Sequence, residues 1–186
     1  MIDELFKRAI DGGLAWIGHG RKLRASFFKE QAEPIHEVFK QFKAEHMATF
    51  AEVRARLADP AVPLDDIYEL VENRERFERE SWMKFERFDE LARESRARPS
   101  DLYFAYLAEL RRCLIETQGN PTSIVYYHSL EEELEEAIGR AKSSSGTKAC
   151  ERAEAIRSVD DITLKFQEYC TSVEMAFLRL RGDSMV

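Results

Sequence analysis

The stretch KACERAEAIRSVDDITLKFQEYCTSVEMAFLRLR, residues 148–181, decides the fold class of this chain. Its apolar residues return every three or four positions, which is the spacing of one face of an α-helix. The pattern predicts one long helix, which we expect to end at Gly182. The residues of its apolar face are Ala149, Ala153, Ile156, Val159, Thr163, Phe166, Cys170, Val173, Phe177 and Leu180.

Two further stretches have the same periodicity. In residues 21–57 an apolar line runs from Leu23 to Leu57, with Pro34 inside it. Proline lacks an amide proton, so we expect this helix to kink there or to start afresh after Ala32. The segment DPAVP, residues 59–63, then breaks the helix, and residues 64–97 form another periodic stretch. These two stretches predict a second and a third long helix.

Shorter helices have recognisable ends. Asp101 follows Pro99 and Ser100 and is expected to start a helix that stops at Gly119, Asn120 and Pro121. Ser129 and Glu132 have the spacing of a capping box for a helix that ends near residues 143–146. The run between them, residues 124–127, is too short for its periodicity to distinguish an extended piece from a helical turn.

These elements predict an all-α fold, an elongated antiparallel bundle of four to six helices, three of them about 30 residues or longer. Residues 1–20 are expected to form an N-terminal arm or short helix, residues 21–182 a single bundle domain, and residues 183–186 a tail. With only 8 glycines and 5 prolines, the chain lacks the turn residues of a fold built from many short strands.

Composition also indicates the protein's partners and cellular location. The chain has 28 Lys and Arg against 35 Asp and Glu, a net charge of -7, which argues against broad nucleic-acid binding. The first residues are acidic where a signal peptide is basic, and charges interrupt every apolar stretch that could span a membrane. The three cysteines are widely spaced, so we expect them to be reduced in a cytoplasmic protein.

One helix has no clear polar face. Leu102, Tyr103, Phe104, Tyr106, Leu107 and Leu110 point in more directions than one core normally covers. An uncovered aromatic patch is typical of a protein interface, and a homodimer is the simplest cover for it. The alternative is that residues 2–10 or 124–127 fold over this side within one chain.

A basic segment stands out in this acidic chain. Residues 16–29 contain large aromatics and no acid, and their predicted anion-contacting residues are Trp16, Arg21, Lys22, Arg24 and Lys29. Basic and aromatic side chains together favour contact with an anionic membrane surface or a nucleic acid. The alternative is that the aromatics are core and the basic residues balance acids such as those of residues 131–136.

Signals for chemistry are weak. Glu33 and His36 have the Glu-x-x-His spacing of a carboxylate-bridged metal bundle, but no second such pair accompanies them, so no metal and no cofactor is predicted. His46 lies on the core line of its helix, where a histidine is most often neutral and hydrogen-bonded. We find no catalytic residues.

The sequence therefore favours a non-enzymatic helical-bundle module that binds another protein or itself. A peripheral adaptor for an anionic surface, acting through residues 16–29, is the second hypothesis. A metal-dependent bundle enzyme that uses Glu33 and His36 is the third.

Overall fold

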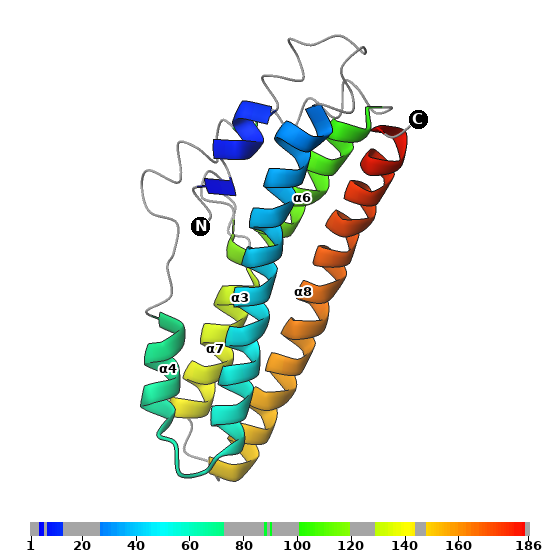
Figure 1. Ribbon diagram of the computed structural model, residues 1–186. Helices are drawn as coiled ribbons and strands as arrows, with labels where there is room; N and C mark the ends of the chain where they lie inside the picture. The colour runs from blue at the N-terminus through cyan, green and yellow to red at the C-terminus, as the bar shows by residue number, and fades with distance from the viewer. Residues whose placement is uncertain are drawn as a thin grey trace. The chain divides into compact units, whose positions relative to one another are not determined.

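The computed structural model describes residues 4, 5, 7–12, 27–72, 88, 90, 101–119, 129–143 and 148–184. No strand occurs among them, and the predicted all-α class is confirmed. The named elements in chain order are η2 (Phe28–Ala32), α3 (Glu33–Ala58), α4 (Leu64–Glu72), α6 (Leu102–Gln118), α7 (Leu130–Ser143) and α8 (Lys148–Ser184) (Figure 1).

The predicted helix ends are confirmed by hydrogen bonds. The Asp101 carboxylate accepts the backbone N–H of Tyr103 at 3.0 Å, which satisfies one of the unpaired amides at the start of α6. Gly119 ends α6 with a φ of 89°, a left-handed conformation that glycine adopts without steric penalty. Ser129 and Glu132 form a reciprocal capping box, with bonds of 3.0 and 3.3 Å, at the start of α7.

Pro34 has a clear local effect. The five residues before Glu33 form a π-helical turn, η2, and the Glu33 amide donates to Phe28 O, five residues back. An α-helix begins at Glu33 itself. The sequence predicts a kink at Pro34 or a fresh helix start after Ala32. The structure shows no break, because the backbone at Glu33 keeps helical dihedral angles and only the hydrogen-bond pattern changes, from π-helical to α-helical, just before the proline.

Two predicted boundaries differ from the structure. α8 continues through Gly182 to Ser184, where the Ser184 hydroxyl donates to Leu180 O at 2.8 Å, so the prediction that Gly182 ends this helix is wrong. Glycine lowers helix propensity, but it does not by itself end a helix. Of the predicted helix 64–97, the structure describes α4 and residues 88 and 90, and the remainder lies outside the described residues.

The chain divides into two compact units. Unit 1 comprises Met1–Lys43, Phe77–Leu114 and Tyr169–Val186, and unit 2 comprises Ala44–Arg76 and Ile115–Glu168. Both α3 and α8 are divided between the two units: one part of each helix belongs to unit 1 and the other part to unit 2.

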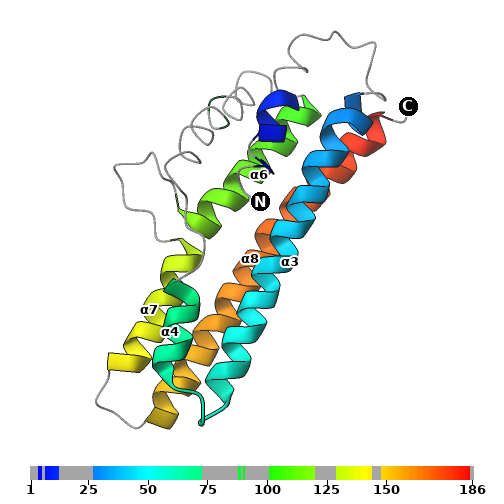
Figure 2. The same cartoon turned by 60° about the vertical axis from the view of Figure 1, so that its left-hand side comes forward.

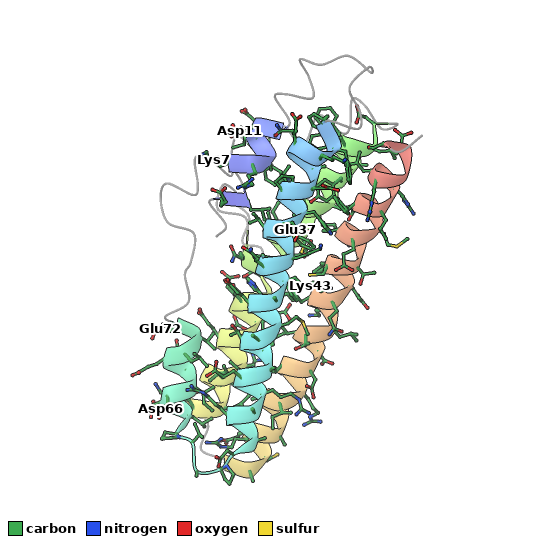
Figure 3. The ribbon with its side chains drawn as sticks, in the orientation of Figure 1. Lys7, Asp11, Glu37, Lys43, Asp66 and Glu72 are labelled. Atoms are coloured by element: carbon green, nitrogen blue, oxygen red, sulfur yellow. The ribbon has the colours of Figure 1, made fainter. Side chains whose placement is uncertain are left out.

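Aromatic rings fill the core of unit 1. Phe27 meets Tyr103 edge to face, with 5.0 Å between ring centroids, and Phe28 lies 5.3 Å from Phe177. Leu5 and Ala9, near the N-terminus, also belong to this core, since both are fully buried. Lys43 at the edge of the unit is ion-paired to Glu174 at 2.7 Å, which joins α3 to α8 (Figure 3).

In unit 2, α4 lies beside α7, as Figure 2 shows. Lys142 of α7 pairs with Asp65 of α4 at 2.7 Å, and its ammonium group lies 4.9 Å from the centre of the Tyr68 ring. Arg54 of α3 pairs with Asp160 of α8 at 2.6 Å. Charged contacts thus connect α4 to α7 and α3 to α8 around an apolar interior.

The Arg152 guanidinium fastens α8 to the end of α3. Its Nη1 donates to the backbone carbonyls of Arg56, Leu57 and Asp59 at 3.3, 3.2 and 3.0 Å, and its Nη2 donates to Val62 O. The last carbonyls of a helix have no partner within the helix. One side chain therefore completes the C-terminus of α3 and holds the turn that leads to α4.

Candidate functional site

The predicted interface residues lie inside the chain. Tyr103, Phe104, Tyr106, Leu107 and Leu110 have no exposed surface, and Leu102 is half-buried. The prediction of an uncovered face here is wrong, because these side chains are buried within unit 1. Phe27 packs on Tyr103, and His36 of α3 and Phe177 of α8 pack on Tyr106. The competing explanation, cover by the N-terminal arm, agrees with the position of Gly12, where an added Cβ would strike the Tyr103 hydroxyl. Residues 124–127 lie outside the described residues.

Of the predicted anion-contacting residues, the structure places one. Lys29 is exposed on η2. Trp16, Arg21, Lys22 and Arg24 lie outside the described residues. The prediction of a basic surface therefore stays a prediction.

Glu33 and His36 have no third metal-ligating side chain grouped with them among the described residues. The described part of the chain contains no group of three or more His, Cys, Asp or Glu side chains that could hold a metal ion. His36 is 5% exposed and stacks on Phe177, and burial lowers its pKa to about 4. It belongs to the aromatic core of unit 1.

His46, which lies on the apolar line of its helix, is buried. Its Nε2 lies 3.2 Å from a carboxylate oxygen of Glu131, a residue 85 positions away in the sequence. The ring also stacks against Phe166, with 5.3 Å between centroids. This contact joins α3, α7 and α8 in unit 2, and its geometry fits a structural role.

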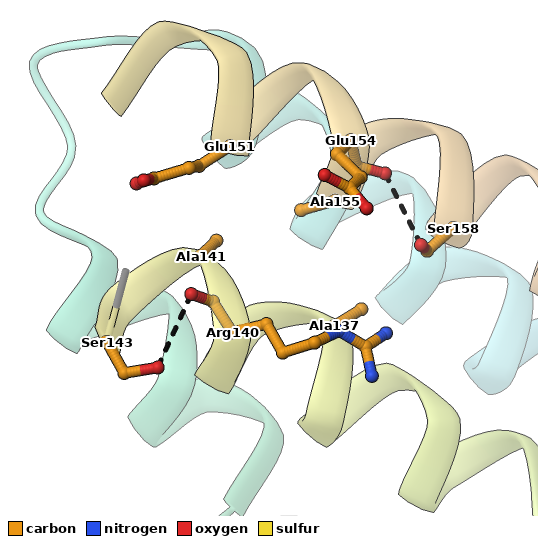
Figure 4. Close-up of a pocket in the computed structure, with 8 residues that line it drawn as sticks. All are labelled: Ala137, Arg140, Ala141, Ser143, Glu151, Glu154, Ala155 and Ser158. Atoms are coloured by element: carbon orange, nitrogen blue, oxygen red, sulfur yellow. Dashed lines mark hydrogen bonds between the residues drawn. The ribbon is translucent and has the colours of Figure 1, made fainter. Parts of the chain in front are cut away.

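A groove in unit 2 is the stronger candidate for function. α7 and α8 run antiparallel, since Glu133 near the start of α7 pairs with Lys165, far along α8. Near the other end of α7 the two helices enclose a cavity of about 340 Å³ (Figure 4). Its lining consists of Ala137, Arg140, Ala141, Ser143, Glu151, Glu154, Ala155 and Ser158.

A second cavity of about 450 Å³ continues along the same two helices. Arg140 and Ser158 line both cavities, so the two form one groove, which we call the α7–α8 groove. Leu164 borders this part with 58% of its surface exposed. The second cavity is lined by Glu133, Glu136, Arg140, Ser158, Asp161, Ile162, Leu164 and Lys165.

The floor of the α7–α8 groove is made of small side chains. Ala137 and Ala141 of α7 face Ala155 of α8, and all three are buried. Because alanine ends at its Cβ, the helices leave a hollow between their larger charged residues. The floor is apolar, and the rims are charged.

The rims of the groove are electrostatically unequal. On α7, Glu136 is paired with Arg140 at 3.3 Å, and Glu133 is paired with Lys165. On α8, Glu151, Glu154 and Asp161 line the groove without an ion-pair partner among the described residues. The α8 rim therefore carries three carboxylates that have no ion-pair partner among the described residues, beside an apolar floor.

Sequence reasoning missed this groove. Leu134, Ala137 and Ile138 could be assigned to an apolar helix face, but the face alone does not show that alanines of two helices lie opposite each other. The available signal was the spacing of Glu151, Glu154 and Asp161, which puts three acids along one side of a predicted helix.

Comparison of the chain with known protein families, curated proteins and solved structures found no match. A search of the described helices for a membrane span found none with sufficient length and apolarity. Functional inference therefore rests on the geometry of this chain.

Proposed function

We propose that this chain is a non-enzymatic interaction module that binds a basic, amphipathic helical segment of another protein in the α7–α8 groove. The observation that supports the proposal most directly is the row of three carboxylates on α8 that have no ion-pair partner within the described part of the chain. Carboxylates beside an apolar floor complement a ligand that has cationic and apolar groups on neighbouring faces.

The dimensions of the groove favour a helix as the occupant. Its α8 lining runs from Glu151 to Lys165, about 21 Å at 1.5 Å per residue, which corresponds to roughly four helical turns. Small residues at a helix interface permit close approach of a third helix. The exposed Leu164 offers one large apolar contact within this length.

A different protein is a better partner for this groove than a second copy. The predicted homodimer depended on an uncovered α6, and five of its six proposed contact residues are buried in unit 1. The groove itself is acidic, and like charges oppose the pairing of two such rims about a two-fold axis.

Two predictions from the sequence stay separate from this proposal. Contact of residues 16–29 with an anionic surface remains the alternative function, supported by the exposure of Lys29. Action in the cytoplasm remains an expectation, and the structure contains no disulfide among its three cysteines.

The test uses the full chain and a labelled helical peptide of about 18 residues. The peptide has basic residues spaced to match Glu151, Glu154 and Asp161, and leucines on the adjoining face. Fluorescence anisotropy at low salt should show saturable binding, weakened by salt because the charges are screened. A peptide of the same composition with scrambled order serves as the ligand control.

Charge reversal identifies the surface. The double variant Glu154→Lys/Asp161→Lys should bind the peptide at least ~10-fold more weakly, since two attractive pairs become repulsive. Glu69→Lys/Glu72→Lys changes the net charge equally at exposed positions of α4 and should stay within ~3-fold of the unmodified protein. Equal losses in both double variants, or equal binding of the scrambled peptide, would contradict the proposed site.

A further inference from the structure

The part of α8 that belongs to unit 1 has an exposed apolar face. Met175 and Leu178 share this face because they are three positions apart, and they are 48% and 54% exposed. Val173, Phe177 and Leu180 are buried in the core of the unit. At about 100° of rotation per residue, the exposed pair lies on the side of the helix opposite to these core residues.

Arginines border the two exposed apolar side chains. Arg179 lies four positions after Met175, and the two are therefore neighbours on the helix surface. Arg181 lies three positions after Leu178 and is its neighbour in the same way. Both arginines are exposed, and neither has an ion-pair partner among the described residues. We call these four side chains the 175–181 face.

Acids are few around the 175–181 face. Residues 175–182 contain no Asp or Glu. Glu174, just before them, is paired with Lys43 of α3 at 2.7 Å, and Asp183 in the last turn of α8 forms no ion pair with Arg179. Because the whole chain has a net charge of -7, this face departs from the general composition. Its charge is complementary to an anionic surface.

The shape and side chains of the face favour a lipid surface over other anionic partners. It is the outer side of one helix and is therefore convex, whereas a helical peptide is usually held in a groove. Met175 and Leu178 have no ring on which a nucleobase could stack. A bilayer interface accepts such apolar side chains, while arginines on their long stems reach the phosphates. A second copy is disfavoured because the arginines of two such faces repel each other.

We propose that the 175–181 face of α8 contacts an anionic membrane surface. Met175 and Leu178 insert at the level of the head groups, and Arg179 and Arg181 bind lipid phosphates beside them. The contact does not rest on peptide binding in the α7–α8 groove. It also differs from the hypothesis for residues 16–29, because all four side chains belong to α8.

Co-sedimentation of the full chain with vesicles tests the proposal. The unmodified protein should bind vesicles of equal parts phosphatidylserine and phosphatidylcholine at low salt, and bind phosphatidylcholine vesicles much less. Arg179→Glu/Arg181→Glu should weaken the binding by ~10-fold or more, because two attractions to the anionic surface become repulsions. Arg140→Glu/Arg157→Glu, which changes the net charge equally at exposed positions of unit 2, should stay within ~3-fold of the unmodified protein.

Two leucines of the same helix test the apolar part of the contact. Leu178→Ser should weaken vesicle binding by ~3-fold or more, because an inserted side chain loses its apolar surface. Leu164→Ser, at a leucine of unit 2 that is 58% exposed, should stay within ~1.5-fold of the unmodified protein. Circular dichroism verifies that each variant keeps its helix content.

Three results would overturn the proposal. The first is equal losses in the matched variants, and the second is the absence of vesicle binding, including the case in which an acidic peptide or a nucleic acid binds through Arg179 and Arg181 instead. The third is a loss confined to Arg21→Glu/Lys22→Glu, which would assign the contact to residues 16–29. Each of these results leaves the α7–α8 groove proposal standing, because that proposal is tested with the basic peptide.

Discussion

The imidazole of His36 lies flat on the ring of Phe177, with 3.7 Å between centroids and 4° between the ring planes. This contact joins α3 to α8 in the core of unit 1, and Tyr106 of α6 borders it at 6.2 Å from His36. Burial, together with the smaller effect of the positive charge of Lys40, lowers the pKa of His36 from 6.5 to about 4. The folded protein therefore favours neutral His36.

The stability of the protein should depend on pH through His36. Below pH 6.5 the unfolded chain binds a proton at this residue, whereas the folded chain binds one only near pH 4. The free energy of unfolding is therefore highest above pH 6.5. It should fall by up to about 3 kcal/mol as the pH falls toward 4. Urea unfolding between pH 7 and 4 measures this loss.

His36→Leu isolates the contribution of the histidine from that of the carboxylates. The variant should unfold within about 1.5 kcal/mol of the unmodified protein at pH 7, because the site is apolar. Its stability should fall less steeply between pH 6.5 and 4. Parallel curves for the two proteins would show that the protonation of His36 does not oppose folding.

Removal of the Arg152 side chain should destabilise unit 2. Arg152→Ala leaves the carbonyls of Arg56 and Leu57 at the end of α3 without their donor, and we expect a loss of about 2 kcal/mol. Arg152→Lys should recover less than half, because an ammonium group cannot reach four carbonyls at once. Arg157→Ala, at an exposed position of α8, should change stability by less than about 0.5 kcal/mol. Equal stability of all three variants in chemical denaturation would exclude the capping role.

Gly12 is constrained by Tyr103. A Cβ at position 12 would strike the tyrosine hydroxyl and would lie 3.3 Å from Ile35 Cδ1. Gly12→Ala should therefore destabilise the protein by about 1–3 kcal/mol through overpacking. The same substitution in a Tyr103→Phe background should destabilise it by at least about 1 kcal/mol less, since the struck atom is absent. Additive effects in this double-mutant cycle would contradict the contact.

The basic segment has its own test. The sequence predicts that residues 16–29 bind anionic vesicles at low salt, with an affinity that falls as salt rises. Arg21→Glu/Lys22→Glu should weaken the binding by ~10-fold or more and flatten its salt dependence, which vesicle co-sedimentation measures. If the unmodified protein fails to bind at low salt, the anionic-surface hypothesis is wrong.

Local features of the fold could be predicted from the sequence. The capping box of Ser129 and Glu132 and the end of α6 at Gly119 depend on interactions within a few residues of each other. The apolar line of residues 148–181 likewise needs only helical geometry. These elements form where the sequence predicts them because neighbouring residues determine them.

Contacts between distant segments could not be predicted. Nothing in the sequence indicates that Glu131 is the partner of His46, because the fold brings them together across 85 positions. Tyr103 and Tyr106 of α6 are buried by side chains from several distant segments. The sequence pattern of this helix does not show those segments, so it predicts an exposed apolar face. The α7–α8 groove belongs to the same class, since it exists only when alanines of two helices face each other.

The most direct test of the proposed interaction is a map of the amides that respond to the basic peptide. Titration of the peptide into the isotope-labelled chain at low salt, followed by NMR, reports chemical-shift changes residue by residue. The proposal predicts that the largest changes occur at groove residues of α7 and α8, including Ala141, Glu151 and Ala155. Changes centred on α4 or α6, or no saturable change, would contradict binding in the α7–α8 groove.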